Sequence, residues 1–140
     1  MFLEVLVYIL TPLAAVVVVL TRLRLSKDES AGRLRISHRL LLVHTVAGTL
    51  GWLSWVLFLV FAVDSFLGSS VTGILALGLW WLTACVGLLI LARWLPARGR
   101  HARSAAMDSW SKGPWLSVLA HVGLVVGVLV FTYAYLTSTV

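Results

Sequence analysis

Four long apolar stretches dominate this chain of 140 residues. They cover about 2–21, 40–63, 70–92 and 114–137, and each is close to the roughly 20 residues that cross about 30 Å of hydrocarbon. Backbone N–H and C=O groups have no partners in lipid, so each stretch is expected to form a helix. With 61% hydrophobic residues, the chain carries more apolar surface than a soluble core of this size can bury. The sequence therefore predicts an all-α integral membrane four-helix bundle, with residues 1–140 as one domain.

The basic residues predict how this bundle sits in a membrane. All eleven Lys and Arg residues lie in two segments between apolar stretches, six in 22–39 and five in 93–113. The connection 64–69 and both chain ends carry none. By the positive-inside rule, the basic segments are cytoplasmic and both termini face outward, which predicts an antiparallel up-down-up-down bundle in the bacterial cytoplasmic (inner) membrane. Because topology accounts for the net charge of +6, no nucleic-acid partner is expected.

Two histidines lie inside apolar stretches, where an ionisable side chain is costly and favours a functional hypothesis. His44 lies about five residues inside the second stretch and His121 about seven inside the fourth, and both stretches are predicted to run outward. At about 1.5 Å rise per residue, the two imidazoles fall within about one turn of the same depth. Two imidazoles at one depth on separate helices form the geometry that the axial ligands of a six-coordinate b-type haem require.

Other residues bear on this haem hypothesis. Gly48 follows His44 by one turn, where a missing side chain would let a porphyrin approach the backbone, but no glycine lies one turn from His121. Arg39 and Lys112 are candidate partners for the haem propionates. Cationic side chains are common in any cytoplasmic loop, so these two do not separate haem binding from other functions.

A second interpretation makes the histidines structural. Each imidazole would then hydrogen-bond across the bundle, for example to Ser117 or Thr45. A mononuclear metal site is not expected, because no intramembrane Asp, Glu or Met accompanies the pair. The sequence also lacks a carboxylate pair, a Ser-His-Asp arrangement, a phosphate-binding glycine loop and HExxH, so it favours a non-enzymatic protein.

Four tryptophans, Trp52, Trp55, Trp80 and Trp81, lie near the middle of the second and third stretches. Tryptophan prefers the membrane interface, so indoles at this depth are unusual and their N–H groups need partners. We expect them to pack against each other as bundle core. The alternative is that they line a site for a quinone, a lipid tail or a partner helix.

Small residues spaced by four let two helices approach closely. The second stretch contains Ala47-x-x-x-Gly51 and the fourth contains Gly123-x-x-x-Gly127. Gly123 lies about 200° around the helix from His121, so the glycine face and the histidine face of the fourth stretch point in different directions. One face can then serve the bundle while the other meets a second chain.

The segment 44–55, His-Thr-Val-Ala-Gly-Thr-Leu-Gly-Trp-Leu-Ser-Trp, resembles the first motif of small four-helix bacterial membrane proteins related to the copper-resistance CopD group, many of them actinobacterial. In those families a histidine near the start of a span is followed two turns later by a Trp and Gly pair. Here Gly51 precedes Trp52, and this Trp stands eight places after the histidine, one more than in the family pattern. The resemblance implies that His44 belongs to a helix of the family type, and copper handling is not carried over.

These features favour an accessory or assembly subunit of a larger membrane complex or homo-oligomer. Its expected partners are the lipid bilayer and a second membrane protein or a second copy of the chain. The alternative is a b-type haem electron carrier that uses His44 and His121. A small transporter or channel is the third hypothesis. It would have to be oligomeric, because four spans with two histidines offer little polar pathway unless copies assemble.

Overall fold

The protein is described by a computed structural model that covers residues 1–27, 37–98 and 115–140. Each of its four helices is long and apolar enough to cross a membrane, which confirms the all-helical prediction and indicates a multi-pass membrane protein. The helices are α1 (Phe2–Lys27), α2 (His38–Val60), α3 (Ser70–Arg98) and α4 (Trp115–Leu136).

The helix ends differ from the predicted apolar stretches. Helix α1 continues to Lys27 instead of ending at 21, and α3 continues to Arg98 instead of 92. Leu, Arg and Lys are good helix formers, so a helix need not stop where its apolar stretch stops. Helix α2 ends at Val60 rather than 63, because Phe61 takes an extended backbone while its N–H closes the last turn on the Leu57 carbonyl. Differences of one or two residues occur at the starts of α2 and α4 and at the end of α4.

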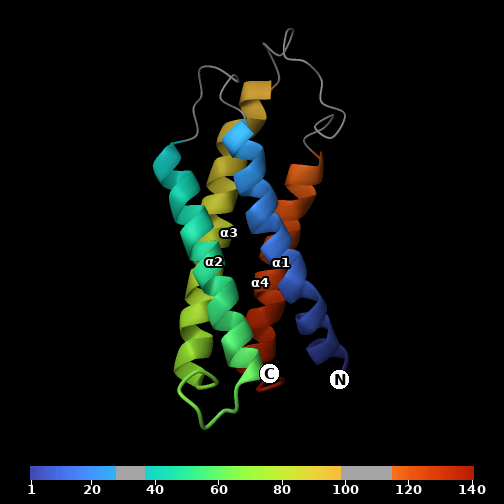
Figure 1. Ribbon diagram of the computed structural model, residues 1–140. Coiled ribbons are helices and arrows are strands. Elements are labelled where there is room, and N and C mark those ends of the chain that lie inside the picture. The colour runs from blue at the N-terminus through green and yellow to red at the C-terminus, as the bar shows by residue number, and fades with distance from the viewer. Residues whose placement is uncertain (28–36, 99–114) are drawn as a thin grey trace.

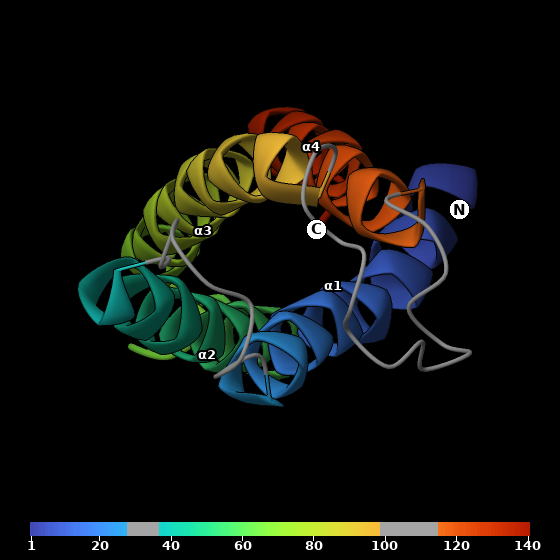
Figure 2. The same cartoon turned by 90° about the horizontal axis from the view of Figure 1, so that it is seen from above.

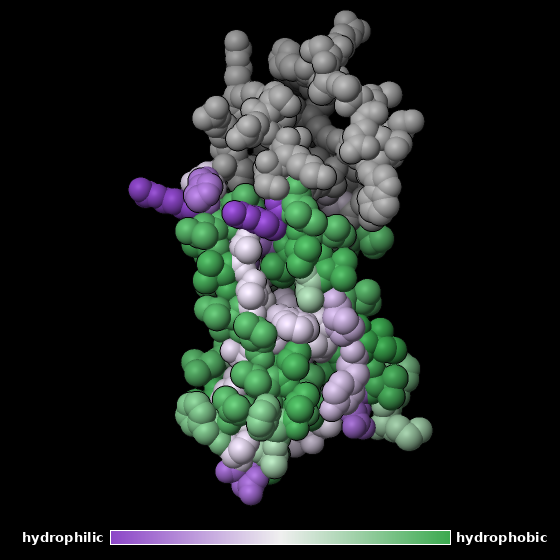
Figure 3. Space-filling view, viewed as in Figure 1, coloured by the Kyte–Doolittle hydropathy of each residue, from purple (hydrophilic) through white to green (hydrophobic). Residues whose placement is uncertain are grey.

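The four helices form a ring in which each packs against two others. Helix α1 packs against α2 and α4, and α3 packs against α2 and α4, with the α2–α3 contact the most extensive. Viewed along the helices, the four ribbons enclose a common centre (Figure 2). Both chain ends lie at the same end of the helices as the 61–69 connection (Figure 1). Hydrophobic side chains cover most of the length between the two ends (Figure 3).

Polar hydroxyls inside the ring are satisfied by their own helices. Thr11 and Thr83 are buried, and each donates its hydroxyl hydrogen to the carbonyl four residues earlier, Val7 and Leu79, over 2.8 and 2.7 Å. Thr132 donates to Val128 in the same way. Threonine can therefore face the interior without leaving a buried donor unpaired. The histidines and tryptophans described next differ in this respect.

Candidate functional site

The two intramembrane histidines meet at the centre of the ring. His44 of α2 and His121 of α4 come from helices on opposite sides, and their ring centroids lie 6.2 Å apart with the ring planes tilted by 39°. His44 is completely buried and His121 is 6% exposed. Two ionisable rings thus share the interior of the half of the bundle that is nearer the basic segments.

The two imidazoles are held differently. His121 lies 2.7 Å through its Nδ1 from the carbonyl of Ser117, one turn earlier on α4. A carbonyl can only accept, so Nδ1 carries the proton and, in the neutral ring, Nε2 carries the lone pair. Neither ring nitrogen of His44 has a hydrogen-bond partner within the described ranges. No hydrogen bond from His44 across the bundle is found among the described residues, the Ser117 carbonyl contacts His121 within α4, and the Thr45 hydroxyl donates to Leu41.

The rings are too far apart to hydrogen-bond to each other. Each ring nitrogen lies about 1 Å from its centroid, so a 6.2 Å centroid separation leaves about 4 Å or more between nitrogens, whereas an N–H···N bond needs about 3 Å. The separation accommodates one intervening atom. A metal ion at about 2 Å from each nitrogen, or a water that hydrogen-bonds to both at about 2.8 Å, meets this condition.

Gly87 of α3 completes the site, and sequence reasoning missed it. A Cβ at this position would lie 2.9 Å from Cδ2 of His121 and 3.2 Å from Nε2 of His44. The α3 backbone therefore packs closely on both imidazoles, and a side chain at this position would have to displace at least one of the rings. We call His44, Gly87 and His121 the histidine layer.

The space for a haem can be examined along the line between the two imidazoles and across that line. Along the line between the rings, the 6.2 Å separation suits an iron about 2 Å from each nitrogen. Across that line, a porphyrin would overlap the α3 backbone at Gly87, which lies against both rings. A macrocycle therefore does not fit the histidine layer as it is packed.

The other residues predicted for haem are placed elsewhere. The space beside Gly48 is filled, because a Cβ there would lie 2.6 Å from Val18 and 3.2 Å from Thr83. Arg39 is exposed at the start of α2. Lys112 lies outside the described residues. Arg39 therefore does not belong to the buried histidine pair.

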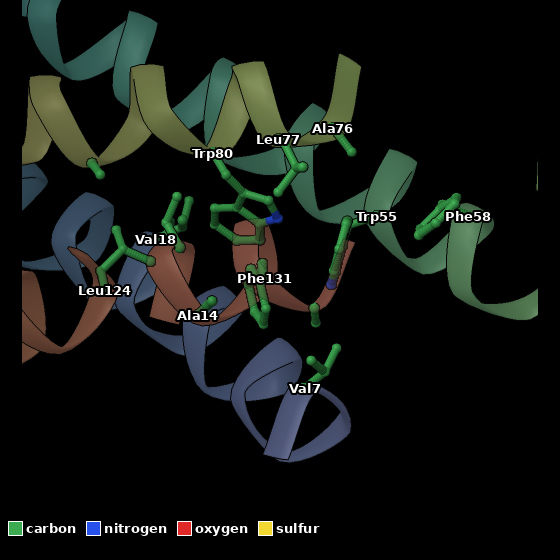
Figure 4. Packing of buried hydrophobic residues seen from close by; sticks show 13 residues of the cluster. Val7, Ala14, Val18, Trp55, Phe58, Ala76, Leu77, Trp80, Leu124 and Phe131 are labelled. Atoms are coloured by element: carbon green, nitrogen blue, oxygen red, sulfur yellow. The ribbon is translucent and has the colours of Figure 1, made fainter. Parts of the chain in front are cut away.

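The four tryptophans do not form one cluster. Trp55 and Trp80 are fully buried, and both rings pack on Phe131 of α4, at centroid distances of 5.0 and 6.0 Å (Figure 4). We call Trp55, Trp80 and Phe131 the aromatic layer. Trp81, by contrast, is 36% exposed and donates its indole N–H to the Thr132 hydroxyl over 3.2 Å. Adjacent residues point about 100° apart on a helix, so Trp80 and Trp81 cannot both face the centre.

Trp52 is half-buried and packs against the core. The indole N–H groups of Trp52, Trp55 and Trp80 have no hydrogen-bond partner among the described residues. Their contribution is therefore through packed aromatic surface rather than through hydrogen bonds.

The two small-residue motifs have different surroundings. Ala47 and Gly51 are buried, and a Cβ on Gly51 would lie 3.1 Å from Leu79 of α3, so this motif is used inside the bundle. A Cβ on Gly123 or Gly127 would meet nothing within 4 Å. Gly123 is exposed and Gly127 is buried, so the α4 motif leaves open space on the outside of its helix only at Gly123.

Within the described parts of the chain, no three His, Cys, Asp or Glu side chains gather to hold a metal ion. Comparison with known proteins finds no match to a family model, to a curated protein or to a solved structure. The site is therefore interpreted from its own geometry.

Proposed function

We propose that the chain spans the bacterial cytoplasmic membrane four times in alternating directions, with both termini outside. The distribution of all eleven basic residues over two connections supports this orientation. Reporter fusions at the C-terminus and within 99–114 would test it, because an enzyme active only outside the cytoplasm should be active at the C-terminus and inactive in the loop. The reverse pattern would contradict the orientation.

We further propose that the protein is a non-enzymatic accessory subunit that packs against a second copy of itself or another membrane protein. The exposed position of Gly123 on α4, with open space beside it, carries this proposal. Glycines spaced by four let two helix backbones approach closely in a membrane, where van der Waals packing drives association. The space beside Gly51 of α2 is already occupied by α3, which leaves the α4 face for an outside helix.

The oligomeric state in lipid nanodiscs and the partner chains retained in mild detergent would test this function. We expect the wild type to form a dimer or to retain a partner, and we expect Gly123→Ile to lose it. Gly78→Ile is the matched control, because Gly78 also has open space beside it but lies on α3. A monomeric wild type with no partner, or equal loss in the control, would contradict the proposal.

A b-type haem carrier is the second candidate, favoured by the ring separation and by the unpartnered nitrogens of His44. It requires α3 to move outward at Gly87, since the layer as packed excludes a porphyrin. Oxidised and dithionite-reduced absorption spectra of the purified protein decide it, with His44→Ala and His121→Ala as controls. A reduced α-band lost in both variants would establish haem, and its absence from protein purified with cofactors retained would exclude it.

A transporter or channel is a weaker proposal for a single copy. The aromatic layer fills the centre of the described bundle with fully buried rings. A polar pathway would then have to form between copies, so the oligomer measurement above also tests this third function.

A further inference from the structure

A groove on the outer surface is apolar, unlike the histidine layer, and points to a lipid site. It lies between α2 and α3 and has a volume of about 310 Å³. Ala47 is the small, buried residue among larger neighbours, which explains the hollow at this place. The seven lining side chains are all aliphatic: Leu42, Val43, Val46, Ala47, Leu50, Leu79 and Leu82.

The groove has the length of one acyl chain in one leaflet. From Leu42 to Leu50 the helix rises about 12 Å, at about 1.5 Å per residue. The hydrocarbon of a single leaflet is about 15 Å deep, half of the bilayer's roughly 30 Å. The outer residues of the groove, such as Val46 and Leu50, are nearly half exposed, so the hollow opens toward lipid.

A cationic side chain stands at one end of this groove. Arg39 precedes Leu42 and Val43 by three and four residues, and Val46 and Leu50 continue the same helical stripe. Arg39 is exposed, and the first turn of α2 contains no acidic residue. No acidic side chain among the described residues pairs with Arg39, so its guanidinium can reach a phosphate at the membrane surface from a flexible side chain.

We propose that this groove binds one anionic phospholipid of the cytoplasmic leaflet, with an acyl chain between α2 and α3 and the phosphate at Arg39. The headgroup supplies the selectivity, because one lipid tail replaces another without hydrophobic gain. The leaflet follows from the proposed orientation, whereas the site does not depend on the accessory function. Failure of lipid binding would therefore leave the α4 proposal intact.

The test uses the full chain in nanodiscs of equal phosphatidylglycerol and phosphatidylcholine, extracted into mild detergent and examined by native mass spectrometry. We expect one retained phospholipid per chain, with phosphatidylglycerol preferred about fivefold, as expected for one arginine at an anionic surface. Arg39→Gln should lower the ratio of retained phosphatidylglycerol to phosphatidylcholine from about five to about one. Arg39→Lys should keep most of the preference. Equal retention of the two lipids by the wild type would overturn the proposal.

A second pair of variants tests the groove itself. Val46→Trp should fill the groove and reduce lipid retention severalfold. Val16→Trp is the matched control, because Val16 of α1 is similarly exposed, 49% against 47%, and does not line the groove. Equal loss in both variants, or a protein chain retained in place of the phospholipid, would overturn the assignment.

Discussion

The two halves of the bundle interior are built in different ways. In the aromatic layer, Trp55, Trp80 and Phe131 are all fully buried and in ring contact. About 16 Å away along α2, at eleven residues of separation, the histidine layer brings two polar rings against a glycine. The first half is filled by large aromatic rings, whereas the second combines two polar rings with buried aliphatic side chains such as Leu41, Ile90 and Leu124.

This difference indicates which half serves folding. Large aromatic rings gain dispersion energy from dense packing, and that gain is available in lipid as well as in water. A buried imidazole with unpartnered nitrogens costs free energy, because neither lipid nor a packed core hydrogen-bonds to it. The unpartnered indole N–H groups of Trp55 and Trp80 carry a similar cost, but each indole offers a larger apolar surface to offset it. We therefore infer that the aromatic layer stabilises the bundle, and that the histidine layer is where a role beyond folding should be sought.

The largest effect is expected from Trp55→Ala. Removing a fully buried indole should reduce the free energy of unfolding by about 3–5 kcal/mol, through lost contacts and the cavity left behind. Reversible unfolding in mixed micelles measures this loss. Trp55→Phe is the control, since it keeps a ring against Phe131 and should cost less. A loss below about 1 kcal/mol for the alanine variant would break the comparison, because such a site would not be a well-packed core.

Gly87→Ala should give the next largest effect. The new methyl group would lie 2.9 Å from the His121 ring and 3.2 Å from Nε2 of His44, an overpacking that costs about 1–3 kcal/mol. Gly78→Ala on the same helix meets open space and should be neutral or stabilising by up to about 1 kcal/mol. Thermal unfolding of both variants in one detergent measures the difference. If both variants unfold at the same temperature, the α3 backbone does not pack tightly against the histidines.

The four helices could be predicted because their signal is local. A run of about 20 apolar residues must be helical in lipid whatever its neighbours do. The similar depth of His44 and His121 followed from counting residues, and the structure places their rings 6.2 Å apart. Helix ends were less accurate, since Lys27 and Arg98 continue helices beyond the hydrocarbon limit that hydropathy marks.

Local sequence signals could not predict which residues surround the two histidines. Which face of α3 meets the histidines depends on the rotation of three packed helices, and this rotation set Gly87 against both rings. The sequence did contain a weak signal for Gly87. Thr83 and Gly87 are small residues four apart on one stripe of α3, the same spacing as in the two small-residue motifs of α2 and α4. The separation of Trp80 from Trp81 could have been foreseen, as adjacent residues diverge by about 100° on a helix.

Replacing each histidine by leucine sharpens the comparison within the histidine layer. His121→Leu removes the hydrogen bond to Ser117 and should cost about 1 kcal/mol. His44→Leu removes a buried polar ring with no partner among the described residues, so it should be neutral or stabilising. Unfolding in mixed micelles measures both. If both variants lose stability equally, the two rings act together on a bound atom, and the layer contributes to folding after all.

The smallest effect is expected at the rim of the aromatic layer, where Trp81 of α3 donates its indole N–H to Thr132 of α4 over 3.2 Å. Such interhelical hydrogen bonds are worth about 0.6 kcal/mol in membranes. Trp81→Phe and Thr132→Val should each reduce the free energy of unfolding by about that amount, and the double variant should lose little more than either single one. Additive losses would mean that the hydrogen bond contributes nothing. A coupling well above 1 kcal/mol would show that polar contacts also hold the aromatic half together, which would weaken the contrast between packing in one half and polarity in the other.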